Sequence, residues 1–155
     1  MNKKGFTLIE LLIVIAIIAI IAGVVFVALD PLTRFQDSRD SRRWGDLTGI
    51  LSAVKIHQVD NKGSYLGTIA SLAADTPAMI TSGAGSAGTC TATTTLASVD
   101  LSGLATGGYL SAVPMDPQGG SASSTLYYLI KRSNGTVTVG ACAPEHTATG
   151  ISVAR

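Results

Sequence analysis

Charged and aromatic side chains are scarce in this chain of 155 residues. Only 14% of the residues are charged, with 11 Lys and Arg against 10 Asp and Glu, and 5% are aromatic. Nucleic-acid binding driven by net charge needs a basic patch, and the near-neutral balance argues against it. The length fits one domain plus a membrane segment. Past residue 29 the chain is rich in Gly, Ser, Thr and Ala, so we expect that domain to bury a modest core.

The patterns of familiar catalytic and metal sites are also missing. The sequence has no Gly-rich phosphate loop, no His-Glu-x-x-His, no Gly-x-Ser-x-Gly and no paired-cysteine zinc pattern. Its two histidines, His57 and His146, are remote in sequence and are interpreted as structural or surface residues. We therefore expect no enzyme activity, no catalytic residue, no metal and no cofactor.

Cysteine is limited to Cys90 and Cys142. In an exported domain with a small core, such a pair favours one disulfide, whereas two thiols cannot form a four-cysteine metal site. The bridge would close a loop of about 50 residues, worth about 4 kcal/mol in the loop-entropy model. The alternative is two free, buried cysteines.

A long apolar run dominates the N-terminal part of the chain. Residues 11–29 are 19 consecutive residues without a charge or a hydroxyl group. A helix over residues 6–29 would extend about 36 Å, enough to cross a hydrocarbon core of about 30 Å. In lipid a single span must be helical to satisfy its backbone. Glu10 is the exception, because a carboxylate in such a run costs roughly 3 kcal/mol without a partner.

An ordinary secretory signal peptide explains this region less well. Such peptides have a shorter apolar core followed by small residues at a cleavage site, and no Ala-x-Ala pattern follows the run here. A count of flanking charges, Lys3 and Lys4 against four arginines from Arg34 to Arg43, favours a cytoplasmic C-terminal domain. The pattern of residues 4–10 ahead of the apolar run and the cysteine pair favour the opposite orientation. An ordinary signal anchor, with Glu10 reaching to the interface, is the remaining alternative.

The stretch Lys4-Gly5-Phe6-Thr7-Leu8-Ile9-Glu10 ahead of the apolar run resembles the N-terminal signal of type IV pilins and type II secretion pseudopilins. The resemblance implies cleavage between Gly5 and Phe6 by a prepilin peptidase, followed by N-methylation of Phe6. It also implies that Glu10 neutralises the Phe6 amine of its own or a neighbouring subunit during filament assembly. The partners implied are copies of the chain itself, the peptidase and an inner-membrane assembly platform.

The helix is expected to continue beyond the membrane run. Asp30-Pro31 predicts a kink or a restart, because Asp suits an N-cap and Pro the first helical position. Many type IV pilins carry a proline inside the apolar segment, and this chain does not. An amphipathic pattern over residues 30–61 follows, with its apolar stripe at Trp44, Leu47, Ile50, Leu51 and Val54.

Three features of this second helix are open to interpretation. Its mixed charges from Arg34 to Asp46, including an Arg42–Asp46 attraction, indicate either a solvated face or a contact between subunits. Gly45 and Gly49 would allow close approach of a sheet or a neighbour. At the end, Gly63 is the expected left-handed cap. The exit turn resembles that of pseudopilins and small pilins, which implies that the Tyr65 ring lies back on the helix.

The remaining residues, 62–155, predict a small globular head. Short helices are expected at residues 69–74 and 99–104, and a surface loop at residues 81–95. Strands are expected at residues 125–131, 136–141 and 150–154, the first two joined by a hairpin whose Asn134 and Gly135 both have positive φ. The segment around Pro114-Met115-Asp116-Pro117 resembles a turn of the major pseudopilins. The loop after it lacks the carboxylates of a calcium site.

The combined interpretation is an α+β fold of the pilin type. It comprises a cleaved leader (1–5), a transmembrane and filament-core helix (6–29), its amphipathic continuation (30–61) and a head (62–155) on a small antiparallel sheet. The expected function is a structural subunit of a type IV pilus or similar filament. The alternatives are a major pseudopilin of a type II secretion system and a single-pass anchored binding domain. The head would lie outside the cytoplasm, and nucleic acid would be a partner only if the filament serves DNA uptake.

Overall fold

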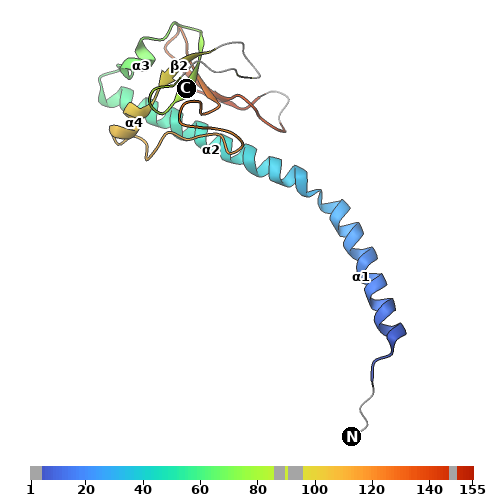
Figure 1. The fold of residues 1–155 in the computed structure, drawn as a ribbon. Coiled ribbons are helices and arrows are strands. Elements are labelled where there is room, and N and C mark those ends of the chain that lie inside the picture. Colours follow the sequence, from blue (N-terminus) through green and yellow to red (C-terminus); the bar gives the residue numbers. More distant parts are fainter. Residues whose placement is uncertain (1–4, 86–89, 91–95, 147–149) are drawn as a thin grey trace. The chain divides into compact units, whose positions relative to one another are not determined.

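The computed structural model describes residues 5–85, 90, 96–146 and 150–155. The chain divides into two compact units, Met1–Phe35 and Gln36–Arg155, which are described separately. The expected leader falls largely on residues 1–4, outside the described residues, and the expected surface loop at 81–95 is described only in part. The second unit has the α+β fold that the sequence predicts, with helix α2 packed on a small sheet (Figure 1).

The first unit contains helix α1, Leu8–Leu29, and the first residues of α2, Pro31–Asp60. No side chain of α1 is buried, and α1 belongs to a helical stretch long and apolar enough to cross a membrane. Asp30 separates the two helices with a left-handed φ of 36°. Its carboxylate accepts a hydrogen bond from the Thr33 hydroxyl at 2.6 Å. The expected restart at Pro31 is confirmed, whereas α1 begins at Leu8 instead of the expected residue 6.

In the second unit, α2 supplies one wall of the hydrophobic core. Leu47, Ile50, Leu51 and Val54 are buried, as the pattern predicts. Trp44 was expected in the same stripe and is 43% exposed. The buried stripe continues toward the N-terminus of α2 through two polar side chains, Asp40 and Arg43.

The end of α2 follows the expected capping pattern. Lys62 and Gly63 both have positive φ, 55° and 89°, and the Gly63 N–H donates to the Gln58 carbonyl at 2.7 Å. This is a Schellman-type end in which Lys62 takes the left-handed position before Gly63. The Tyr65 ring lies 5.9 Å from Lys55 Nζ on α2, which confirms that it folds back on the helix. Its hydroxyl donates to the Gly135 carbonyl at 2.7 Å.

The sheet has five strands in the order β2-β1-β3-β4-β5. The strands are β1 (Pro77–Thr81), β2 (Ala97–Asp100), β3 (Tyr127–Lys131), β4 (Val137–Ala141) and β5 (Ser152–Ala154). All neighbours are antiparallel except β1 and β2. Tyr127, Leu129, Val137 and Val139 are buried in one core with the apolar side chains of α2. The three C-terminal strands are those expected from sequence, each a little shorter.

The expectations for residues 66–106 were wrong in three places. The first short helix is α3, Gly67–Ala70, which begins and ends earlier than residues 69–74. Strand β1 was not predicted. Residues assigned to a helix at 99–104 instead form the end of β2 and most of α4, Ser102–Thr106. The chain changes direction at Asp100, between β2 and α4. The Asp100 carboxylate stabilises this turn by accepting hydrogen bonds from the amides of Gly83 and Ser102, each at 2.8 Å.

The β3–β4 connection is the predicted hairpin with a different turn. Gly135 has φ +81°, and its N–H donates to the Arg132 carbonyl at 3.1 Å. Asn134 does not have the positive φ that was expected of it. The loop is thus a three-residue connection with one left-handed glycine. The side-chain oxygen of Asn134 instead accepts a hydrogen bond from the Thr136 amide at 3.0 Å, and this bond also stabilises the turn.

A disulfide joins Cys90 to Cys142, with a sequence separation of 52 residues. Both cysteines are buried, in a second small cluster with Met79 and Leu96. The Cys142 amide donates to the Leu126 carbonyl at 2.9 Å, so one end of the bridge is anchored beside the sheet. The bridge therefore ties a Gly- and Ser-rich loop to the C-terminal part of the head.

Candidate functional site

The N-terminal segment holds Glu10 in a capping box. Thr7 is the N-cap of α1, and its hydroxyl oxygen accepts from the Glu10 amide at 3.3 Å. Glu10 Oε2 in turn accepts from the Thr7 amide at 2.9 Å and the Thr7 hydroxyl at 2.6 Å. This reciprocal arrangement satisfies free amides at the start of the helix and places a negative charge where the helix dipole favours it. The Glu10 carboxylate in the apolar run is thus stabilised locally by the hydrogen bonds of the capping box.

Gly5 and Phe6 lie just before this cap in non-helical, exposed backbone, and Phe6 is 79% exposed. The geometry therefore brings the three residues singled out at the N-terminus, Gly5, Phe6 and Glu10, into one short segment. The peptide bond between Gly5 and Phe6 is outside any helix. Cleavage there would leave Thr7 and the capping box intact.

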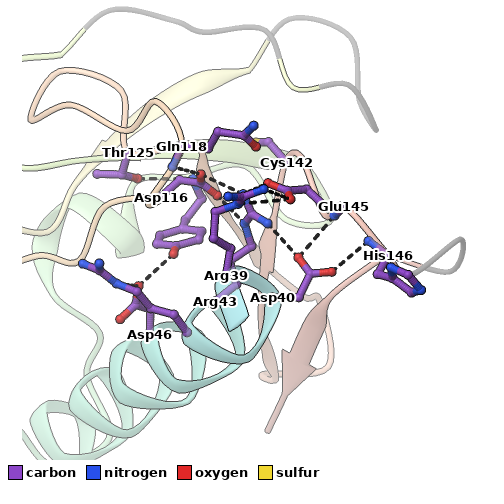
Figure 2. Close-up of polar contacts among 12 residues, drawn as sticks. Arg39, Asp40, Arg43, Asp46, Asp116, Gln118, Thr125, Cys142, Glu145 and His146 are labelled. Atoms are coloured by element: carbon purple, nitrogen blue, oxygen red, sulfur yellow. Dashed lines mark hydrogen bonds and ion pairs between the residues drawn. The ribbon is translucent and has the colours of Figure 1, made fainter. Parts of the chain in front are cut away.

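A second polar site lies inside the head and was not predicted. Arg43 projects from α2 and is completely buried. Its Nε and Nη2 donate to the two oxygens of Asp116, at 2.6 and 3.0 Å, and its Nη1 donates to Asp40 at 2.7 Å. Figure 2 shows this guanidinium between α2 and the turn that carries Asp116. A bidentate pair of this kind is among the stronger charge-assisted interactions in proteins.

The same site binds the segment that follows the disulfide. Asp40 accepts from the backbone amides of Glu145, at 3.2 Å, and His146, at 2.9 Å. The Glu145 carboxylate accepts from Arg39 Nε at 2.8 Å and from Arg43 at 3.4 Å. We call these five side chains the ion cluster: Arg39, Asp40, Arg43, Asp116 and Glu145. The ion cluster joins α2, the Asp116 turn and the C-terminal segment (Figure 2).

Ionisation of the ion cluster follows from these contacts. The hydrogen bond from Arg39 lowers the pKa of Glu145 below its ordinary value. Burial opposes ionisation of Asp40, but hydrogen bonds from Arg43 and from the amides of His146 and Glu145 outweigh it and lower its pKa. The bond to Asp116 raises the pKa of Arg43. The arginines therefore favour the ionised forms of Asp40 and Glu145.

The sequence contains a signal that Asp40 and Arg43 of the ion cluster are buried. Asp40 and Arg43 fall on the same three- and four-residue steps as Leu47, Ile50 and Val54, which places them on the buried face. A solvated face is thus wrong for Asp40 and Arg43. It holds for Arg42, which is 64% exposed, and the expected Arg42–Asp46 pair is present at 3.9 Å. Asp46 also accepts from the buried Tyr127 hydroxyl at 2.8 Å.

The other polar residues considered from sequence do not join one site. His57 packs its ring against Tyr109 at 5.2 Å between centroids, and His146 lies 3.8 Å from Asp37 at the surface. Within the described residues, no group of three or more His, Cys, Asp or Glu is arranged to hold a metal ion. The oxygens of Asp116 are engaged by Arg43 and by the Gln118 amide at 2.8 Å. Nothing approaches within 4 Å of a Cβ built on Gly45 or Gly49, so close approach of this chain's own sheet is wrong.

Comparison with known proteins bears on the N-terminal segment directly. Residues 1–26 match the prokaryotic N-terminal methylation motif. The chain is 42% identical over 84 residues to the type IV wide pilus major component PilA4 of Thermus thermophilus. The match covers 52% of this chain and 62% of that protein, so the chain spans less than two thirds of its relative. No solved structure matches the chain significantly. In its methylation motif and its α+β fold, the chain is similar to type IV pilins.

Proposed function

We propose that this chain is a structural subunit of a type IV pilus, assembled through its N-terminal hydrophobic helix. The match to the N-terminal methylation motif and the similarity to a pilus major component support a pilin-type structural subunit. The observation that carries the finer proposal is α1, a helix of 22 residues that, apart from Glu10, presents apolar side chains on every side and buries none of them. Such a helix is stable in lipid or in a bundle of other helices. A filament core supplies the bundle once the subunit leaves the membrane.

Glu10 is the residue proposed to control that transfer. In lipid its charge is costly, and the capping box reduces the cost by supplying two donors from Thr7. Cleavage between Gly5 and Phe6 by a prepilin peptidase would create a free amine four residues before Glu10. Pairing of this amine, N-methylated on Phe6, with the carboxylate of the same or a neighbouring copy would offset burial of both charges in the filament.

The proposed organisation follows the same division. The leader is residues 1–5, the core helix residues 6–29, its continuation residues 30–61 and the head residues 62–155. Before assembly the chain would cross the cytoplasmic membrane once with its head outside the cytoplasm, and the disulfide suits that compartment. An inner-membrane platform would then add it to an extracellular filament.

The outward side of α2 is a proposed contact between subunits. We call outer face the six residues that follow one another at steps of three and four: Ser41, Gly45, Thr48, Ser52, Ile56 and Val59. The outer face carries no charge, and Ile56 and Val59 are exposed apolar side chains. The hydroxyls of Ser41 and Thr48 donate to carbonyls of their own helix, at 2.8 Å each. A solvated helix face normally carries charged residues, so this face suits another helix.

Gly45 provides a test of the outer face. Gly45→Ala is expected to stabilise the head by up to about 1 kcal/mol, since the site is helical and open. Gly45→Leu is expected to leave the head folded but to reduce the amount of the chain in surface filaments at least about tenfold. This reduction is equivalent to a loss of about 1.4 kcal/mol of contact free energy. Immunoblots of sheared filaments against membrane fractions measure this. Gly67→Leu is the matched control, because Gly67 is also exposed with open space around its Cβ. Equal incorporation of all variants would remove the outer face from the contact.

Two alternatives are tested by one experiment. A major pseudopilin is favoured by the Pro-x-Asp-Pro turn, and a single-pass anchor by the apolar helix alone. Deleting the chain in its native cell and imaging surface filaments, together with a secretion assay, separates them. Loss of filaments with normal secretion is the expected result. Loss of secretion with filaments retained would favour the pseudopilin, and no change in either would favour the anchor.

A further inference from the structure

We propose that residues 142–146 form a strap held on α2 by the ion cluster, and that acid releases this strap while the sheet remains folded. The strap begins at Cys142, which is fixed by the disulfide and by the hydrogen bond from its backbone N–H to the Leu126 carbonyl. It ends at Glu145 and His146, which are fixed by the ion cluster. The two ends are thus held by different chemistry.

The distal end of the strap is attached by polar contacts. None of the four residues after Cys142 is buried, so apolar burial contributes little there. The Glu145 carboxylate and the Glu145 and His146 amides instead bind Arg39, Asp40 and Arg43 on α2. Attachment therefore depends on the charge of two carboxylates. The sheet beneath is held by buried Leu129, Val137 and Val139, whose packing does not titrate.

The sign of the pH dependence follows from the charges that face the strap. These are Asp37, Arg39, Asp40 and Arg43 from α2, Asp116 from its turn, and Glu145 and His146 from the strap, with Asp46 and Tyr127 behind them. The pKa values of Asp40 and Glu145 are lowered in the folded chain. Their contribution is therefore complete above the ordinary carboxylate pKa and is lost as pH falls through the lowered values.

Release is expected to be local for two reasons. The disulfide does not respond to acid, so it keeps Cys142 in place when the distal end leaves. Arg43 also contacts Asp116, at 2.6 and 3.0 Å, and Asp116 lies on a separate turn, so departure of Glu145 does not by itself remove every partner of the buried guanidinium. His146 also lies 3.8 Å from Asp37, but this half-exposed contact contributes little to the attachment of the strap.

Hydrogen exchange of the full chain in detergent tests the strap. The amides of Glu145 and His146 donate to Asp40 and report its closure, and the amides of β3 and β4 report the sheet. From pH 7 to about pH 3, after correction for intrinsic exchange, protection of the two strap amides is expected to fall at least about tenfold. Protection in β3 and β4 is expected to be unchanged over that range.

Variants separate the strap from general acid sensitivity. Glu145→Gln keeps the size of the side chain and removes its charge, so the two strap amides should lose protection already at pH 7. Asp60→Asn, at an exposed carboxylate at the end of α2, is the control and should match the parent chain. Strap and sheet amides losing protection together, strap protection persisting at pH 3, or an unchanged Glu145→Gln variant would each overturn the proposal.

Discussion

Glu10→Leu is expected to remove the chain from surface filaments while leaving its amount in the membrane unchanged. Leucine relieves the cost of a carboxylate in lipid, roughly 3 kcal/mol, so insertion should not suffer. The variant can no longer pair with the Phe6 amine, which would then be buried alone in the filament. A loss of several kcal/mol per subunit corresponds to a drop of more than about a hundredfold in incorporation. Immunoblots of sheared filaments and membranes give the ratio.

Ile13→Leu is the matched control for this variant. It changes the shape of one exposed apolar side chain in α1 without altering charge. We expect its incorporation to stay near that of the parent chain. If Glu10→Leu were incorporated into filaments to the same extent as Ile13→Leu, the carboxylate would have no role in assembly. The anchored binding domain would then become the better interpretation.

Arg43→Met is expected to destabilise the head by about 3–5 kcal/mol. The substitution leaves the buried Asp116 carboxylate without its bidentate partner and takes one partner from Asp40. Arg42→Met, one position away at a 64% exposed arginine paired at 3.9 Å, should change stability by less than about 1 kcal/mol. Urea unfolding of the full chain in detergent, followed by Trp44 fluorescence, measures both.

A double variant shows where the cost of Arg43→Met arises. Arg43→Met with Asp116→Leu removes the unpaired charge as well as its partner, so it should recover part of the loss, because apolar replacements of buried ion pairs are often tolerated. Similar losses in Arg42→Met and Arg43→Met would contradict the view that burial makes Arg43 structurally important.

The features that were predictable from sequence are those set by neighbouring residues. The apolar run required a helix, Pro31 restarted it, and Gly63 ended its continuation. Alternating β-branched and aromatic residues around Asn134-Gly135 located the central hairpin. The capping box was not predicted, although Thr7 and Glu10 are three residues apart, the spacing that it requires. In each case the physical cause lies within a few residues of the effect.

The features that were missed depend on distant partners. The local sequence of strand β2, Ala97 to Asp100, carries little strand signal. The strand forms by pairing with β1, which precedes it by a Gly- and Ser-rich segment. The burial of Arg43 depends on Asp116, 73 residues away, and on Glu145, 102 residues away. Because these partners are distant in sequence, the charges of α2 were interpreted as a solvated face or a subunit contact, and burial in the head was not considered. Trp44 was expected in the apolar stripe from its spacing to Leu47 and Leu51, but it is 43% exposed.

The N-terminus of the chain recovered from sheared surface filaments tests the central claim most directly. Mass spectrometry of that terminal peptide is expected to find a chain that begins at Phe6 and carries one methyl group on its amine. Filaments that lack the chain, or a chain found only in membranes and still beginning at Met1, would contradict its assignment as a processed filament subunit.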